Sequence, residues 1–247
     1  MNCKNCGHDV EGNFCSNCGQ SLKVGRINLP NFIKEVSEGI FQVNKGFFYT
    51  LRALFTKPGK SLRGFLNGKR KQHFKPITYV ITLSTVYFLS AQLTDQNTWM
   101  DDIISGWMNA ELENVEDVKI PPILAWFSKN YAYTTLLLLP FFSLASYLSF
   151  FKYGKNYLEH IVINSYITGQ QAIIYTIFTI LGAPFENNII ESLPILLAIP
   201  YTFWAFIQFF NEGNSIVIFL RTILSYILYL FFSSALLVLL MEVSFRD

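Results

Sequence analysis

All four cysteines of the chain lie within its first 18 residues, where they form two C-x-x-C pairs. Cys3 and Cys6 make the first pair, Cys15 and Cys18 make the second, and a glycine follows each pair. Two such turns offer four thiolates to one tetrahedral ion, and zinc is the usual occupant of a four-cysteine site. Each glycine permits the open backbone that the turn needs. The spacing therefore predicts a zinc ribbon at residues 1–20, with these four cysteines as metal ligands.

Other uses of the four thiols are an iron site of the rubredoxin type, two disulfides, or reduced cysteines without metal. The spacer is short for a rubredoxin-like site, and thiols facing the cytosol stay reduced, which favours zinc. His8 is an alternative ligand, although four cysteines already complete the set. Residues 1–20 contain a single base, Lys4, against Asp9 and Glu11, so we expect no binding of nucleic acid.

A second group of polar residues lies at the start of, and within, the apolar stretch 161–181. Residues three or four apart share one face of a helix. This spacing places six polar side chains on one stripe, which are Glu159, His160, Asn164, Tyr166, Gln170 and Gln171. Polar groups at membrane depth are costly, so the stripe is a candidate intramembrane site that faces the other helices and not lipid.

Hydrogen bonding between helices is the simplest explanation of this stripe, and we favour it. The alternatives are a transport or binding path with His160 as a proton carrier, or a lipid-handling active site with Glu159 and His160 as base and ligand. The sequence contains no H-E-x-x-H, G-x-S-x-G or Walker motif. We therefore assign no catalytic residue.

The segment between the ribbon and residue 76 is basic and amphipathic. Apolar residues recur at helical spacing, and Lys57-Pro58-Gly59 and Asn67-Gly68 interrupt them. From residue 57 to residue 75 there are seven bases and no acid, namely Lys57, Lys60, Arg63, Lys69, Arg70, Lys71 and Lys75. Such helices fit the headgroup layer, where each base near an anionic leaflet contributes roughly 1 kcal/mol.

These seven bases are candidate contacts with anionic lipid headgroups, and we expect His73 to face the headgroups with them. A plain positively charged flank of the first span is the simplest explanation. Specific recognition of a lipid headgroup, an RNA-binding patch and docking of a protein partner are the alternatives. We call residues 21–75 the basic collar.

The elements that must position these groups are strongly apolar. Hydrophobic residues make up 51% of the chain and charged residues only 15%, against about 25% in soluble domains. Residues 76–247 contain five apolar segments near the length of a bilayer span, at 76–93, 131–151, 161–181, 193–210 and 216–241. The sequence predicts an all-α integral membrane protein with about five transmembrane helices, preceded by a small zinc ribbon and amphipathic interfacial helices.

The charges are segregated along the chain. Residues 1–75 hold 13 of the 19 Lys and Arg, whereas residues 95–118 hold seven of the 17 acids and no base. Because bases accumulate on the cytoplasmic side, we expect a multi-pass protein of the cytoplasmic (inner) membrane with its N-terminus in the cytoplasm. The acidic segment is predicted to form a short outer helix before Pro121-Pro122. A calcium site there is an alternative to a solvated face, but no D-x-D-x-D-G loop supports it.

Short motifs in residues 3–80 follow a distinctive order. They are Phe14–Gln20, Arg26-Ile27, Lys45–Phe48 with Thr50, Lys57-Pro58-Gly59, Gly68-Lys69-Arg70, and Lys75-Pro76 with Tyr79. In this order the chain resembles a bacterial membrane-protein family known as domain of unknown function 3667. The pair Glu159-His160 at the start of a later span is also similar. The resemblance implies metal ligation by the four cysteines, and it implies no established activity.

Recognisable chemistry is confined to the ribbon and the collar. The sequence therefore favours a non-enzymatic scaffold or regulatory protein whose zinc ribbon docks a protein partner at the cytoplasmic face. The alternative is a small transporter or lipid-handling enzyme that uses the polar stripe of the third span.

Overall fold

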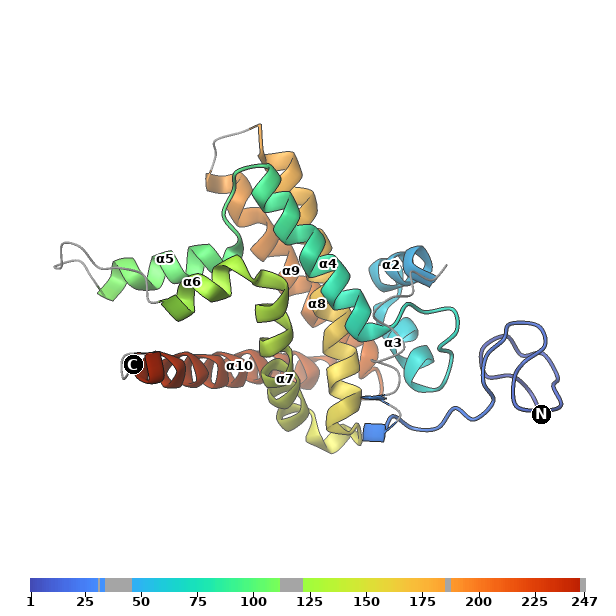
Figure 1. Ribbon diagram of the computed structural model, residues 1–247. Coiled ribbons are helices and arrows are strands. Elements are labelled where there is room, and N and C mark those ends of the chain that lie inside the picture. Colours follow the sequence, from blue (N-terminus) through green and yellow to red (C-terminus); the bar gives the residue numbers. More distant parts are fainter. Residues whose placement is uncertain (31, 34–45, 112–121, 185–187, 245–247) are drawn as a thin grey trace.

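We analysed the fold in a computed structural model of the chain, which describes residues 1–30, 32–33, 46–111, 122–184 and 188–244 (Figure 1). Of the described residues, 73% are helical and none belongs to a strand. The predicted all-helical class is therefore confirmed. Residues 31 and 34–45 of the collar and the acids Glu113, Glu116 and Asp117 lie outside the described residues.

Helices α2 and α3 belong to the collar and the others to the body. Their bounds are α2 Gly46–Thr56, α3 Pro58–Leu66, α4 Pro76–Leu93, α5 Trp99–Glu111, α6 Pro122–Lys129, α7 Tyr131–Ser149, η1 Phe151–Tyr153, α8 Tyr157–Gly182, α9 Asn188–Phe209 and α10 Ser215–Ser244. Proline occupies the first turn of both α3 and α4. It is tolerated there because a backbone N–H in the first turn would have no acceptor within the helix. The predicted breaks at residues 57–59 and 67–68 are confirmed.

Helix α8 is the centre of the body. It packs against α4, α7 and α9, and 16 of its 26 residues are buried. Gly169 allows α8 to lie close to α4, because a Cβ at this position would lie 2.6 Å from Cδ1 of Tyr79 on α4. Protein therefore surrounds α8, which explains how this helix tolerates polar residues that a lipid-facing helix would expose to hydrocarbon.

Among the described residues, three helices are long and apolar enough to cross a bilayer, namely α4, α7 and the Ser215–Leu240 part of α10. This finding supports a membrane protein, but it does not confirm the five spans predicted from the sequence. The apolar part of α9, Leu193–Phe209, is shorter than the roughly 20 residues of a typical span. Helix α8 is long enough, but its buried polar residues exclude it from the apolar set.

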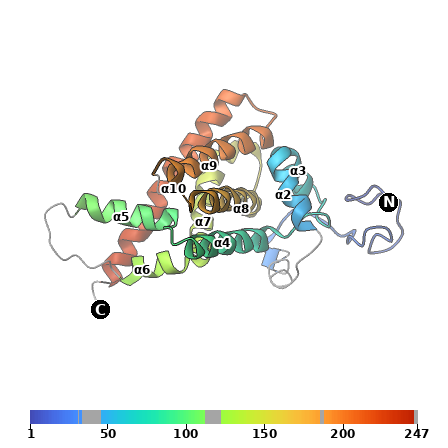
Figure 2. The ribbon, with the colours of Figure 1, turned by 90° about the horizontal axis from the view of Figure 1, so that it is seen from above.

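Helix α10 differs from α8 in both burial and direction. Its apolar window is only 6% buried, whereas protein covers most of α8. An apolar helix that the protein leaves uncovered is suited to contact with lipid. Figures 1 and 2 show α10 lying across α8 and not alongside it. The apolar helices therefore do not form one parallel set.

The collar is attached to the body through α3. A Cβ on Gly59 would lie 2.2 Å from the carbonyl oxygen of Gln208, so α3 touches the backbone at the end of α9. The guanidinium of Arg63 donates to the carbonyl oxygen of Phe209 over 2.8 Å and also to that of Gln208. Carbonyls at a helix C-terminus lack partners within the helix, and Arg63 supplies one. This contact fixes the collar at one end of the bundle.

Candidate metal centre and basic pocket

The four cysteines of the ribbon converge as the sequence predicted. Their sulfur atoms all lie within 4.8 Å of one another, with Cys3 Sγ 3.7 Å from Cys18 Sγ and Cys6 Sγ 3.6 Å from Cys15 Sγ. Four sulfurs at about 2.3 Å from one ion are about 3.8 Å apart, so the set fits a tetrahedral metal. All four are free thiols, too far apart for disulfides of about 2.05 Å. The residues can bind one metal ion, and the donor set suits zinc and iron alike.

Two similar turns place these ligands. In each turn the glycine amide donates to the carbonyl of the first cysteine, over 2.9 Å at Gly7 and 2.8 Å at Gly19. Both glycines have positive φ, at +77° and +69°, which confirms the predicted need for glycine. The backbone N–H of His8 lowers the pKa of Cys6 to about 6. The His8 side chain is exposed and does not belong to the cysteine cluster.

The ribbon is held to the collar through the buried side chain of Gln20. Its Nε2 donates to the carbonyl oxygen of Gly68 over 2.8 Å, and its Oε1 accepts from the amides of Arg70 and Lys71, each over 3.0 Å. One side chain thus satisfies three backbone groups of the turn that follows α3. Sequence reasoning did not assign Gln20 a role, and its only signal was its place at the end of the ribbon motif.

A second attachment joins the linker after the ribbon to the start of α8. Arg26 Nη2 donates to Glu159 Oε2 over 2.8 Å and to the carbonyl of Gly154 over 2.7 Å, while its Nε lies 3.2 Å from Glu159 Oε1. Glu159 also completes a capping box with Asn156, whose Nδ2 donates to the carbonyl of Ile27. The Glu159 carboxylate therefore caps α8 and anchors the linker.

His160 and Asn164 of the predicted stripe face α7. His160 Nδ1 lies 2.9 Å from the hydroxyl oxygen of Ser146, and Asn164 Nδ2 donates to the same oxygen over 2.7 Å. Both side chains are fully buried. His160 Nε2 and Asn164 Oδ1 have no hydrogen-bond partner in the described part of the chain. This pair of helices is thus joined by a small polar cluster with two unsatisfied atoms.

Tyr166 and Gln170 face the other side of α8. The Tyr166 hydroxyl donates to the carbonyl of Phe74 over 2.6 Å. Gln170 accepts from the hydroxyl of Tyr79 and donates to the carbonyl of Leu51 over 3.2 Å. These two residues therefore join α8 to α4 and to the collar helix α2.

Gln171 points to a third neighbour, because its Nε2 donates to Thr202 Oγ1 of α9 over 2.9 Å. It also lines a mostly apolar cavity of about 320 Å³ between α7, α8, α9 and α10. The six polar residues of the predicted stripe all belong to α8, but they contact different neighbours, namely the linker, α7, α4 with α2, and α9. The structure does not bring them together into one site, and interhelical hydrogen bonding accounts for most of them.

The seven collar bases divide into two groups. The two arginines bind within the protein, since Arg63 contacts the end of α9 and Arg70 donates to the carbonyl of Gly25 over 2.9 Å. The guanidinium of Arg70 also lies 5.6 Å from the centre of the Phe65 ring. The lysines are more accessible, with Lys57, Lys60, Lys69 and Lys71 exposed and Lys75 half-buried. Among the seven bases of residues 57–75, the lysines and not the arginines are therefore the available cations.

His73 does not face the headgroups as predicted, since it is buried at 5% exposure. Its Nδ1 lies 2.7 Å from the carbonyl oxygen of Lys69, and its Nε2 lies 3.0 Å from Ser61 Oγ. A carbonyl oxygen can only accept, so Nδ1 carries the proton and Nε2 accepts from the serine. Burial lowers the pKa of His73, which keeps the ring neutral. His73 thus fixes the turn that carries Lys69 against α3.

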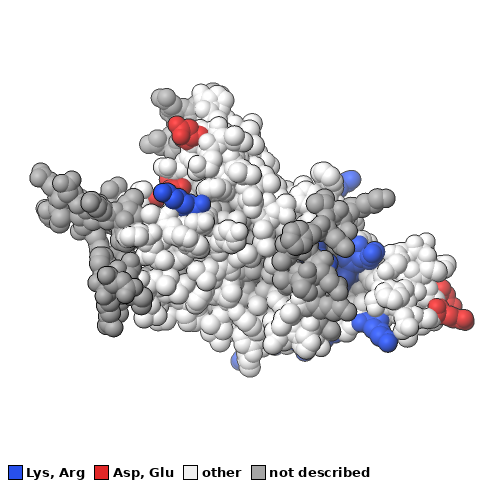
Figure 3. Space-filling model, viewed as in Figure 1, with Lys and Arg blue, Asp and Glu red and all other residues white. Residues whose placement is uncertain are grey.

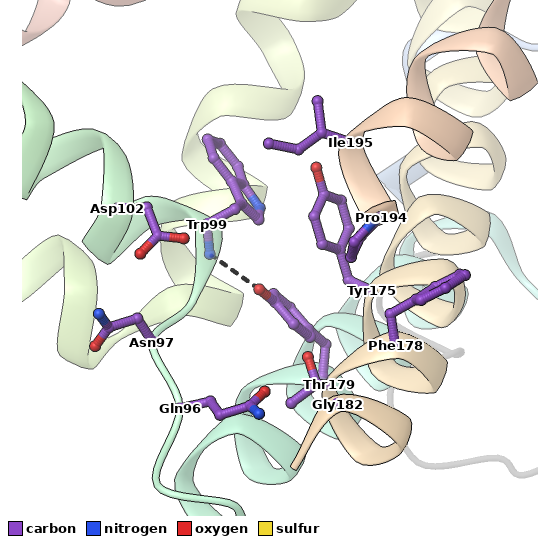
Figure 4. A pocket seen from close by; sticks show the side chains of 11 residues that line it. Gln96, Asn97, Trp99, Asp102, Tyr175, Phe178, Thr179, Gly182, Pro194 and Ile195 are labelled. Carbon is purple, nitrogen blue, oxygen red and sulfur yellow. Dashed lines mark hydrogen bonds between the residues drawn. The ribbon is translucent and has the colours of Figure 1, made fainter. Parts of the chain in front are cut away.

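The acidic segment does not form a cation site in its described part. Asp101 accepts from the amide and hydroxyl of Thr98, over 2.7 and 2.6 Å, at the start of α5. Figure 4 shows Asp102 at a pocket of about 80 Å³, where the Trp99 amide donates to the Tyr87 hydroxyl over 2.9 Å. Among the described residues, the cysteines form the one group of three or more that can hold a metal.

The charged residues gather at opposite ends of α8. Arg221 binds the carbonyl of Ser149, and Lys155 Nζ lies 5.9 Å from the centre of the Phe209 ring, both near the collar. On the face drawn in Figure 3, several Lys and Arg lie where the ribbon meets the body, a further basic group lies beside an acidic one at the far end, and most of the middle carries no charge. The segregation predicted from the sequence therefore has a counterpart in space.

Comparison with known proteins identifies one family. Residues 44–88 match the model of a family described as protein of unknown function, DUF3667. The match supports membership of this family. It confirms the resemblance seen in the motifs, and it covers α2, α3 and much of α4, including the turn that binds Gln20. No curated protein and no solved structure matches the chain.

Proposed function

We propose that the protein is a non-enzymatic scaffold or regulatory protein of the cytoplasmic membrane, in which a zinc-bound ribbon docks a protein partner at the cytoplasmic face. The observation that carries this proposal is how the ribbon is mounted. Gln20 fixes it to the collar, while Phe14 stays 66% exposed. Figure 3 shows acidic side chains at the end of the ribbon that points away from the body, where Asp9 and Glu11 are its acids.

The ribbon needs a bound metal to hold a fixed shape for docking, because its apolar core is very small. Its buried apolar residues are Cys3, Val10 and Cys15. With so little apolar surface to bury, the metal supplies the folding free energy and makes the outer face rigid. A rigid face with an exposed aromatic ring is suited to a protein partner, because aromatic anchors dominate many interfaces.

The orientation follows from the basic end of the body. The collar lysines and the bases at residues 152, 155 and 221 lie at the end that carries the ribbon, and bases prefer the cytoplasmic side. We therefore place the N-terminus, the ribbon and the collar in the cytoplasm, with the collar against anionic headgroups.

The test places a photoreactive amino acid at residue 14 in intact cells. We expect one reproducible protein adduct that disappears in the Cys3→Ser/Cys6→Ser variant, whose ribbon cannot bind metal. A photoreactive residue at Val86, an exposed position on α4, serves as the control. Identical adducts with the intact and the cysteine-substituted ribbon would refute docking through the ribbon. A protease site ahead of Met1 that is cut from outside intact cells would refute the orientation.

A transporter or lipid-handling enzyme is the second candidate, and one observation favours it. The unpartnered Nε2 of the fully buried His160 is the kind of group that a proton or a substrate would bind. This function predicts that His160→Ala abolishes the cellular phenotype while expression and metal content persist. A fully active His160→Ala variant would exclude it and leave the scaffold as the better proposal.

A further inference from the structure

A pocket of about 210 Å³ lies between the collar helices α2 and α3 and the turn that follows α3. Tyr49 and Ala53 line it from α2, and Lys60 and Gly64 line it from α3. The two residues of each pair are four apart, so each pair lies on one face of its helix. The space is smaller than the roughly 300–1,000 Å³ of sites for drug-sized ligands. The pocket therefore fits a small chemical group and not a large molecule.

Three lysines line this pocket and come from different parts of the collar. Lys57 is the N-cap residue of α3, Lys60 lies in its first turn, and Lys69 belongs to the turn after α3. No Asp or Glu lines the pocket in the described part of the chain, and residues 39–94 contain no acid at all. Neither of the two ion pairs among the described residues involves these lysines. Since like charges repel, a bound anion would stabilise this arrangement.

The protein itself fixes the position of the third cation. His73 Nδ1 donates to the carbonyl oxygen of Lys69 over 2.7 Å, and its Nε2 accepts from Ser61 Oγ over 3.0 Å. His73 and Ser61 are both buried and both line the pocket. The Lys69 amide donates to the carbonyl of Gly64 over 2.9 Å, and a Cβ on Gly64 would lie 3.8 Å from Lys69 Cδ. The backbone and the aliphatic stem of Lys69 are therefore held against α3 before any ligand binds.

The charge and the donors of the pocket favour a phosphate group over a carboxylate. Each lysine ammonium group offers three N–H donors. A phosphate monoester carries nearly two negative charges at pH 7 and three strong acceptor oxygens, whereas a carboxylate carries one charge and two oxygens. The first turn of α3 adds partial positive charge at the same place. Three cations that approach from two sides of one small space thus match a tetrahedral dianion.

We infer that this pocket binds the phosphate group of a phosphate monoester, held by the ammonium groups of Lys57, Lys60 and Lys69. A membrane lipid with a terminal phosphate and a soluble phosphate ester both carry this group, and the experiment distinguishes the two sources. The inference goes beyond the proposed function, because it assigns a defined site to three of the seven collar bases. It does not depend on a protein partner of the ribbon, so either proposal can fail alone.

The test measures equilibrium binding to the full-length protein, purified with its metal in a non-ionic detergent. The probes are glycerol 3-phosphate and short-chain phosphatidic acid, which present the same phosphate monoester, and succinate, a dicarboxylate of similar charge. We expect saturable binding of both phosphate probes, with succinate about tenfold weaker than glycerol 3-phosphate or weaker still. Each pocket lysine should contribute about fivefold, so Lys57→Gln/Lys60→Gln should weaken binding about 25-fold.

Matched variants separate a defined pocket from general attraction to the collar. Lys71→Gln/Lys75→Gln removes the same charge from collar residues that do not line the pocket, and it should change affinity less than about twofold. Ala53→Phe fills the pocket and leaves every charge in place, so it should weaken binding about tenfold or more. Gel filtration and metal content verify that each variant is folded. The two lysine pairs decide the question even if Ala53→Phe does not fold.

The two phosphate probes identify the source of the ligand. Phosphatidic acid that binds about tenfold more tightly than glycerol 3-phosphate would support a membrane lipid, and equal affinities would support a soluble phosphate ester.

Three results would overturn the inference. Equal losses in the two double-lysine variants would show attraction to the collar as a whole. Succinate that binds as tightly as glycerol 3-phosphate would show a site without preference for phosphate. The absence of saturable binding with both phosphate probes would show that the lysines form no site.

Discussion

Replacing Gln20 with alanine should release the ribbon from the collar without disturbing its metal site. The side chain makes three hydrogen bonds to backbone groups at Gly68, Arg70 and Lys71. Each is expected to contribute about 1 kcal/mol, so docking should weaken by about 3 kcal/mol, or roughly a hundredfold. The backbone contact from Cys15 to the carbonyl of residue 20 is independent of the side chain and should keep the cysteines in place.

Amide hydrogen exchange measures this effect at the two donors. The amides of Arg70 and Lys71 should exchange faster in Gln20→Ala, and removal of the metal by a chelator should have the same effect in the wild type. Ser21→Ala is the matched control, because the Ser21 hydroxyl bonds only to the nearby amide of Lys23 among the described contacts. Unchanged exchange at both amides in Gln20→Ala, with metal content intact, would refute the proposed attachment.

Three further predictions concern the metal, the helix packing and pH. The purified protein should contain one zinc per chain, and cobalt substitution should give the absorption of a tetrahedral tetrathiolate; iron found instead would contradict the zinc assignment. Gly169→Ala should lower stability in detergent by about 1–3 kcal/mol, because its Cβ would meet the Tyr79 ring, whereas Gly106→Ala, with open space around it, should lower it far less. Desolvation by burial lowers the pKa of His73 below 6.5. As the pH falls below 6.5, the unfolded chain therefore binds a proton that the folded chain does not bind, and the folded state loses stability. The melting temperature should therefore fall between pH 7.5 and pH 5.5, and less so in His73→Gln; equal falls in both would contradict this role.

The sequence predicted the local features well. Helix breaks at residues 57–59 and 67–68 follow from proline and glycine, and the two C-x-x-C turns bring four sulfurs within 4.8 Å. These features depend on neighbours along the chain, which a sequence displays directly. The number of spans was less predictable, because it depends on which helices the protein covers. Helix α8 is buried and can carry polar residues, whereas most of the apolar part of α10 is uncovered.

Spacing along one helix cannot identify the partners of each side chain. Glu159 and His160 are adjacent in the sequence, yet one binds Arg26 of the linker and the other contacts Ser146 of α7. A helix surrounded on several sides presents successive residues to different neighbours, since each residue turns by about 100°. The predicted single stripe therefore became four separate sets of contacts.

By itself, the sequence determined that the chain carries a metal-ligand set at one end, bases beside it and a large apolar remainder. These properties follow from residue types and from spacings of a few residues. Only the tertiary structure decided that Gln20 joins the ribbon to the collar, that Arg63 and Arg70 are used internally, and that three lysines of the collar line one pocket. Those contacts join residues far apart in the chain, and such pairings arise from packing and not from local preference.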